Sequence, residues 1–297
     1  MRKRLAGLTG LATLGAVAGW LVTAPQRLDA SQVAQGPGNA AAGARLFHAG
    51  GCASCHAAKG AKGDDRLKLG GGAVLATKFG AFQPPNISPG PDGIGGWTLA
   101  QFDNAMRRGV SPDGRHYYPA FPYTSYARMT GQDVADLFAY LKSLPPVAGK
   151  PPETALAFPL NIRRGIGLWK RIHFDDLPMV TLPPDAPAAV RAGQYLVEGP
   201  GHCGECHTPR GPLGGVFRAG WLGGAPDAEG KGRVPNITPA KLTWSEAEIA
   251  EYLKTGFTPD YDSVGGTMVE VQANMAALPD EDRAAIAAYL KAVPAVK

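Results

Sequence analysis

The apolar residues of the chain follow two patterns, and the first is a continuous run near the N-terminus. This run extends from Leu5 to Ala24 without a charge and follows three basic residues at positions 2–4. Its residues, at about 1.5 Å each in a helix, reach across the hydrocarbon core of a bilayer. The run therefore predicts a transmembrane helix over residues 1–24. Its basic flank places the remainder of the chain on the periplasmic side of a bacterial inner membrane.

A cleaved signal peptide is the alternative interpretation of this run. The apolar core of a signal peptide is usually shorter, about 7–15 residues, and Pro25 stands directly after the best cleavage site. Both interpretations export the rest of the chain, so a soluble periplasmic protein is the alternative to an anchored one. Residues 25–39 are expected to form a tether.

The second pattern is helical spacing of apolar residues in segments that begin at helix-capping residues. Thr98 with Gln101, and Ser245 with Glu248, have the spacing of a capping box, and a glycine ends each of these segments. The segments expected to be helical are 40–50, 98–109, 130–144, 188–199, 245–256 and 280–293. Strands should be few, because no sustained alternation of apolar and polar residues appears. The predicted fold class is all-α, with Thr130 and Asp280 capping the last helix of each half.

These helices belong to an internal repeat. "GCASCHA" at 51–57 recurs as "HCGECHT" at 202–208, and "PPNISP" at 84–89 recurs as "VPNITP" at 234–239. Two further landmarks, at 96–112 and 133–145, recur in the same order, and all four pairs are separated by 147 to 151 residues. The repeat predicts two tandem domains, 40–150 and 189–297, and a connection over 151–188. Within this connection, residues 158–174 either pack between the domains, which we favour, or dock on a membrane partner.

Composition narrows the class of protein only slightly. The content of 44% hydrophobic and 19% charged residues is typical of a globular chain, while 40 Gly and 27 Pro indicate long loops. The formal net charge is +5, with a basic first half and an acidic second half. No basic tract is interleaved with aromatic residues, so we expect no nucleic acid partner. Three helices and long loops make a small core, so each half needs a large group at its centre.

The cysteines identify that group. All of them lie in two C-x-x-C-H motifs, which is the attachment pattern for c-type haem. The motifs predict two covalently bound haem c groups, held by thioether bonds from Cys52, Cys55, Cys203 and Cys206. The adjacent His56 and His207 are then placed to bind iron as proximal ligands.

Three other uses of the cysteines fit the sequence less well. A four-thiolate zinc site would need both pairs together, whereas each pair belongs to its own helical unit. A thioredoxin-like redox pair expects a βαβ context, which the pattern does not contain. Two structural disulfides would leave both following histidines unexplained.

At this point the chain resembles the class I c-type cytochromes over nearly all of residues 40–147 and 190–296. "SPDGRHYYPAFPYTSY", "GHCGECHTPR" and "DRAAIAAYLK" are similar to dihaem cytochrome subunits of membrane-bound alcohol and gluconate dehydrogenases. The resemblance implies a cytochrome-c-like helical fold for each half and electron transfer as the task. It also implies a methionine opposite the histidine, in the loop before the last helix.

The methionine of the second half is expected to be Met268, in the loop after two glycines, while Met275 is expected to pack in the core. In the first half the related cytochromes often have YPAMPY, but this chain has YPAFPY with Phe121. We rank Met129 first as the iron ligand there. His116 and an open or differently liganded iron remain as alternatives.

Two further expectations concern the surroundings of the histidines. The backbone at Pro209 is a candidate to accept the Nδ1 proton of His207. The Asn86-Ile87-Ser88 and Asn236-Ile237-Thr238 triplets match a glycosylation acceptor. Their equivalent places in the repeats favour a shared turn near the haem instead.

The predicted function is electron transfer from a dehydrogenase-type donor to a respiratory acceptor, either a quinone site or a terminal oxidase. Coordination of both irons by histidine and methionine suits this task, because a saturated iron exchanges electrons without binding substrate. The alternative is a dihaem enzyme, such as a peroxidase or a thiosulfate dehydrogenase. A peroxidase needs an open iron, and a cysteine-liganded thiosulfate dehydrogenase needs a cysteine that this chain does not have to spare.

Overall fold

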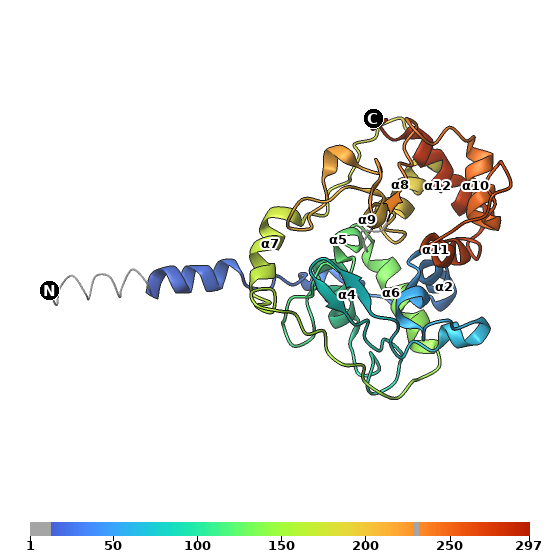
Figure 1. The fold of residues 1–297 in the computed structure, drawn as a ribbon. Helices are drawn as coiled ribbons and strands as arrows, with labels where there is room; N and C mark the ends of the chain where they lie inside the picture. Colours follow the sequence, from blue (N-terminus) through green and yellow to red (C-terminus); the bar gives the residue numbers. More distant parts are fainter. Residues whose placement is uncertain (1–12, 228–231) are drawn as a thin grey trace, which may run out of the picture.

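The structure is a computed structural model that describes residues 13–227 and 232–297, and its elements follow the sequence repeat. The first half contains α2 (Ala40–Ala49), α3 (Cys52–His56), β1 (Leu75–Thr77), β2 (Gly80–Phe82), α4 (Leu99–Arg108), α5 (Tyr123–Tyr126) and α6 (Gly131–Ser143). The second half contains α8 (Ala188–Glu198), α9 (Gly204–His207), β3 (Ala225–Pro226), β4 (Arg233–Val234), α10 (Glu246–Thr255), α11 (Met268–Met275) and α12 (Asp280–Ala292). Short 3₁₀ turns lie at Ala30–Gln32, Gly63–Leu67 and Arg218–Gly220. The two halves pack against each other in one body (Figure 1).

The capping residues determine where most of the long helices begin. Both predicted capping boxes are present, at α4 and at α10, and each helix ends at a glycine in the left-handed region. Thr130 caps α6 as predicted, because its hydroxyl accepts a hydrogen bond from the backbone N–H of Asp133. The prediction for α12 is wrong by one residue. Pro279 occupies the cap position, while Asp280 lies in the first turn and pairs with Arg283.

The core of each half is formed where its first helix crosses its last. A Cβ on Gly43 would lie 2.0 Å from the carbonyl oxygen of Asp136, and a Cβ on Gly193 would lie 1.9 Å from that of Ala285. Only glycine therefore permits α2 to approach α6, and α8 to approach α12, this closely. The apolar residues around these crossings form two clusters, one in each half.

Two features differ from what the sequence predicted. A short antiparallel hairpin, β1–β2 or β3–β4, follows the C-x-x-C-H motif in each half. The segment expected to be a loop through Met268 is instead helical from that residue onward, as α11. Its sequence, Met-Val-Glu-Val-Gln-Ala-Asn-Met, contains no glycine or proline, and its last turn is buried at Asn274 and Met275.

The connection between the halves contains a helix that sequence patterns did not reveal. This helix, α7 (Gly165–His173), contacts both halves. The Lys170 ammonium donates to the carbonyls of Arg108 and Gly109, while the Trp169 indole N–H donates to the carbonyl of Leu213 at 2.8 Å. The connection is thus packed between the two repeats.

The N-terminal segment leaves the body beside α7 (Figure 1). Residues 13–22 are helical, and residues 1–12 of the expected anchor lie outside the described part of the chain. Within residues 13–227 and 232–297, no helix has both the length and the apolar character needed to cross a bilayer. The expected tether is packed rather than free: Leu28 donates to the Asn104 side chain at 2.8 Å, and Asn39 to Asp136 at 2.7 Å.

Candidate functional site

Each C-x-x-C-H motif forms a short helix directly after the first helix of its half. In the first half, Gly51 makes the turn between α2 and α3 with φ of 55°, a conformation that favours glycine. In the second half, His202 occupies the corresponding turn with φ of 39°. Both motifs are therefore held by a helix that is itself packed against the last helix of the same half.

The two motif histidines make the same hydrogen bond. His56 Nδ1 lies 2.8 Å from the carbonyl oxygen of Pro85, and His207 Nδ1 lies 2.8 Å from that of Pro235. A carbonyl only accepts, so Nδ1 must carry the proton in both rings. The other nitrogen, Nε2, then keeps its lone pair free for a metal ion. Burial lowers the pKa of both imidazoles and so favours the neutral form that can bind a metal, although the bond to the proline carbonyl opposes this shift.

The proline carbonyls are held by the turns that the sequence repeats. In the first half, the Asn86 side chain accepts from the N–H of Ser88 and donates to the carbonyls of Val147 and Gly149, all at 2.9 Å. In the second half, Asn236 accepts from Thr238 and donates to the carbonyl of Val296. Both asparagines thus form a shared structural turn that joins the histidine to the chain beyond the last helix.

Pro85 and Pro235 are the functional residues that sequence reasoning missed. The Nδ1 partner was expected at Pro209, but that prediction is wrong, because His207 binds the carbonyl of Pro235. The repeated Pro-Asn-Ile-Ser/Thr motif was the signal that could have identified both prolines. It places the same carbonyl before the same asparagine in each half.

The cysteine thiols lie in surroundings that disfavour the thiolate. Burial raises the pKa of Cys52 and of Cys203 to about 12, and it raises the pKa of Cys55 and Cys206 as well. All of them are free thiols rather than disulfides. A zinc site would require several thiolates in one cluster. Within the described residues, no group of three or more His, Cys, Asp or Glu side chains is placed to hold a metal ion.

Methionine side chains accompany both motifs in the apolar clusters. In the first half, Met129 and Met106 are buried in the cluster against which Cys52 packs. In the second half, Met275 is buried, while Met268 is partly buried against the cluster that Cys203 also contacts. Met129 and Met268, the methionines expected as iron ligands, thus lie in the same apolar cluster as the cysteine motif of their half.

Phe121, which stands where a methionine was expected, and His116, an alternative ligand of the first half, have distinct surroundings. Phe121 lies among aromatic rings, with centroid distances of 5.8 Å to Tyr117 and 5.7 Å to Tyr126. His116 is buried, and its Nε2 lies 2.9 Å from the carbonyl oxygen of Thr23 at the base of the N-terminal helix. One nitrogen of His116 is thus engaged by the N-terminal segment.

Comparison with known families agrees with this repeated geometry. The family model for cytochrome c matches the chain twice, over residues 40–145 and 190–294. The chain belongs to the cytochrome c family. Each match includes one C-x-x-C-H motif together with its proline carbonyl and its last helix.

Relatives among curated proteins extend this result. The chain is 53% identical to a dihaem cytochrome c-type protein of Cereibacter sphaeroides over the full length of both chains. It is 39% identical to the fructose dehydrogenase cytochrome subunit of Gluconobacter japonicus, over 82% of this chain and 50% of that one. It is 35% identical to the cytochrome c subunit of the quinone alcohol dehydrogenase of Gluconacetobacter polyoxogenes, over 86% and 56% respectively. The chain thus spans about half the length of these two subunits.

The residues present fit two haem c groups. Each cytochrome c domain offers free thiols at the motif spacing, an imidazole whose Nε2 is unprotonated, and an apolar cluster next to both. With two such domains and a dihaem relative across its whole length, the chain carries two covalently bound haem c groups. The haem supplies a one-electron iron centre, and the protein holds the imidazole in the correct tautomer.

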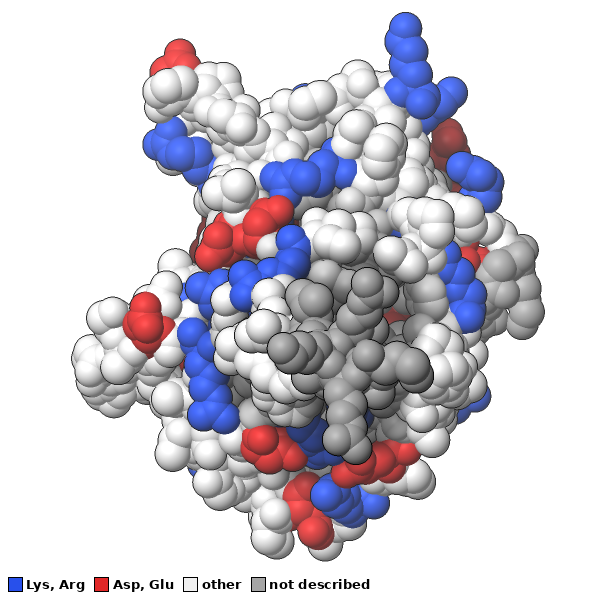
Figure 2. Space-filling view, turned by 90° about the vertical axis from the view of Figure 1, so that its left-hand side faces the viewer, with Lys and Arg blue, Asp and Glu red and all other residues white. Residues whose placement is uncertain are grey.

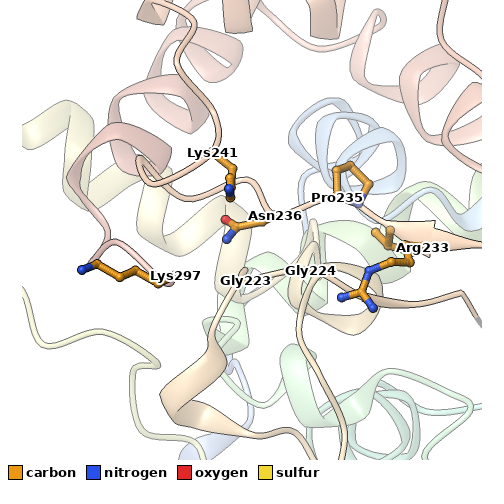
Figure 3. A pocket seen from close by; sticks show the side chains of 8 residues that line it. Gly223, Gly224, Arg233, Pro235, Asn236, Lys241 and Lys297 are labelled. Atoms are coloured by element: carbon orange, nitrogen blue, oxygen red, sulfur yellow. The ribbon is translucent and has the colours of Figure 1, made fainter.

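A polar pocket lies behind the second histidine turn (Figure 3). Pro235 and Asn236 form part of its lining, together with Gly223, Gly224 and the basic side chains of Arg233, Lys241 and Lys297. None of its lining residues belongs to a C-x-x-C-H motif. The pocket therefore flanks the carbonyl that orients His207 and does not replace the haem site.

The asparagine turns generate a prediction about the redox potentials. Replacing Asn86 by alanine frees the Pro85 carbonyl to move away from His56, which makes the imidazole a weaker donor to ferric iron. The midpoint potential of the first haem should rise while that of the second stays unchanged, and Asn236→Ala should do the reverse. A spectroelectrochemical titration of the purified protein measures both potentials. Asn161→Ala, at an exposed position in the connection, is the control; equal shifts of both haems in either turn variant would contradict the assignment.

Proposed function

We propose that the protein is an electron carrier in which Cys52, Cys55, Cys203 and Cys206 hold two haems through thioether bonds. His56 and His207 are the proximal iron ligands. The observation that carries this proposal is the hydrogen bond from each Nδ1 to a proline carbonyl, repeated at 2.8 Å in both halves. The bond fixes the tautomer that leaves Nε2 available and limits rotation of the ring.

The opposite side of each iron is assigned to a methionine. Met129 is proposed for the first haem and Met268 for the second, and both contact the apolar cluster of their half. Coordination by histidine and methionine leaves no open position for a substrate, and the thioether raises the reduction potential. Such an iron accepts and releases an electron with little rearrangement, which favours a carrier over a dihaem peroxidase.

The donor is proposed to be a dehydrogenase and the acceptor a quinone-linked site or an oxidase of a respiratory chain. Support comes from the relatives, whose names identify cytochrome subunits of fructose and alcohol dehydrogenases. These relatives are longer than this chain, so the shared part is the pair of haem domains and not the whole subunit.

The N-terminal helix is proposed to anchor the carrier on the periplasmic side of the membrane. Its last carbonyls are bound by α7 and by the residue before it: Arg164 donates to Thr23 and Trp20, and Arg171 donates to Val22. The Arg164 guanidinium also lies 3.6 Å from the centre of the Trp20 ring. These contacts hold the end of the helix firmly on the body.

The face around this helix supports the same proposal. The apolar side chains of Leu168 and Ile172 are exposed on α7, the helix that binds the end of the N-terminal helix. Figure 2 shows Lys and Arg side chains on this face together with Asp and Glu groups. Since charges of both signs are present, the helix rather than a uniformly basic surface would provide the attachment.

The methionine assignments predict the loss of a spectroscopic signal. Met268→Leu and Met129→Leu conserve side-chain volume, so the folding cost should stay below about 1.5 kcal/mol. Each variant should remove the near-infrared sulfur-to-iron charge-transfer band of one haem. Met275→Leu and Met106→Leu, which change neighbouring methionines of the same clusters, should retain both bands. An unchanged spectrum in Met268→Leu or in Met129→Leu would refute that ligand.

The carrier proposal itself is tested with carbon monoxide. If both irons have two protein ligands, the visible spectrum of the fully reduced protein should stay unchanged after carbon monoxide is added. The protein should also fail to consume hydrogen peroxide when a reductant is supplied. Rapid binding of carbon monoxide at one haem, together with peroxide turnover, would identify a dihaem enzyme instead.

The anchor proposal predicts the mass of the mature protein. If the helix is retained, intact-mass spectrometry of protein purified from membranes should include residues 1–24 along with both haems. Extraction from the membrane should require detergent and not salt alone. A mature chain that begins beyond Ala24 would show that the segment is a cleaved signal.

A further inference from the structure

Each haem attachment motif is contacted by the opposite half of the chain. In the first motif, the hydroxyl of Ser54 accepts a hydrogen bond from the Asn274 side chain at 2.7 Å. In the second motif, the Glu205 carboxylate accepts from the Ser125 hydroxyl at 2.8 Å. Ser54 and Glu205 are both the second variable residue of C-x-x-C-H.

These two contacts are equivalent by the sequence repeat. The repeat that relates Cys52 to Cys203 also relates Ser54 to Glu205. The same repeat, at the last helices, relates Ser125 to Asn274. Ser125 lies in α5 and Asn274 in α11, the helices that precede the last helix of each half. The contact of the first motif with the second half therefore uses the same two repeat positions as the contact of the second motif with the first half.

A second pair of contacts repeats the relation. The Arg45 guanidinium of α2 binds Asp282 of α12 through two hydrogen bonds, at 2.5 and 2.7 Å. The Tyr195 hydroxyl of α8 binds Asp133 of α6. Arg45 and Tyr195 each follow, by two residues, the glycine at the crossing of the first and last helices, so they hold equivalent positions.

Reciprocal contacts of this kind are the signature of a twofold axis. In an isologous interface, residue i of one unit contacts residue j of the other, and j contacts i. The motifs themselves lie close to that axis: a Cβ on Gly50 would be 3.6 Å from the carbonyl oxygen of Pro200.

We infer that the two halves associate through an approximate twofold axis at the haem attachment motifs, and that Ser54 and Glu205 are the positioning residues that fix the two haems relative to each other. This inference rests on the proposed attachment of the haems to these cysteines. The cysteine side chains of the two motifs then bring the attached porphyrin edges toward the shared interface. Haems attached to these cysteines would exchange electrons across this interface, and Ser54 and Glu205 would hold the motifs that carry them.

The two positioning contacts differ in chemistry. Glu205 is an acid held by several partners, since Thr124 and Ser125 donate to it and Arg210 pairs with it. Ser54 is neutral and is bound by Asn274 alone among the interactions described for its side chain. The second motif is therefore the more firmly held of the two.

Circular dichroism of the Soret bands tests this geometry, because two haems held close together in a fixed orientation produce an exciton couplet. The oxidised full-length protein should show a couplet. Glu205→Ala combined with Ser54→Ala should lose most of its amplitude while both haems stay bound and the visible absorption spectrum stays unchanged. Glu205→Gln, which keeps an oxygen to accept from Ser125, should retain the couplet.

The control is Ser143→Ala, which removes an exposed hydroxyl whose partner within the described residues is the carbonyl of Tyr140, in its own half. It should leave the couplet intact. A wild-type protein without a couplet, or a double variant that keeps the full amplitude, would overturn the inference. Either result would leave the carrier proposal standing, because that proposal depends on carbon monoxide binding and on peroxide turnover.

Discussion

The hydrogen bond between each motif imidazole and a proline carbonyl is the constraint on which the rest of the structure depends. It selects the tautomer, so it decides whether Nε2 can bind iron at all. A proline carbonyl on a free loop could not do this reliably. Asn86 and Asn236 therefore connect each carbonyl to the backbone beyond the last helix, through Val147 and Val296.

That connection links the haem ligand to the helix crossing of its half. Gly43 and Gly193 allow the first helix to lie against the last, and the C-x-x-C-H motif follows the first helix directly. The motif thus leaves one end of the crossing, while the asparagine turn is fastened beyond the end of the last helix. Both the histidine and the proline carbonyl that orients it are therefore held in place by the same pair of helices. A cytochrome c domain with only a few helices can in this way position its histidine accurately.

The sequence predicted those features that depend on neighbouring residues. The capping boxes of α4 and α10 need only residues three apart, and the haem motif needs only five consecutive positions. The sequence did not predict contacts between distant segments, such as the one between Arg45 and Asp282, which are separated by 237 residues. The helical start of α11 at Met268 was missed because the preceding Gly265 and Gly266 indicated a loop. The prolines at 85 and 235 were visible as a repeat, but no local rule says which carbonyl faces a ring 28 or 29 residues away.

The two halves share a frame and differ at the side chains that surround their haems. Where the resemblance to dehydrogenase cytochromes implies a methionine, Phe121 joins an aromatic group that includes Tyr117, Tyr123 and Tyr126. Such rings interact edge to face and gain stability from one another, so the substitution is built into the packing of the first half. The acidic contact at Glu205 has only the neutral Ser54 as its counterpart. Glu205 is also paired with Arg210, so these local differences change the hydrogen bonding and packing around each motif without adding an uncompensated charge.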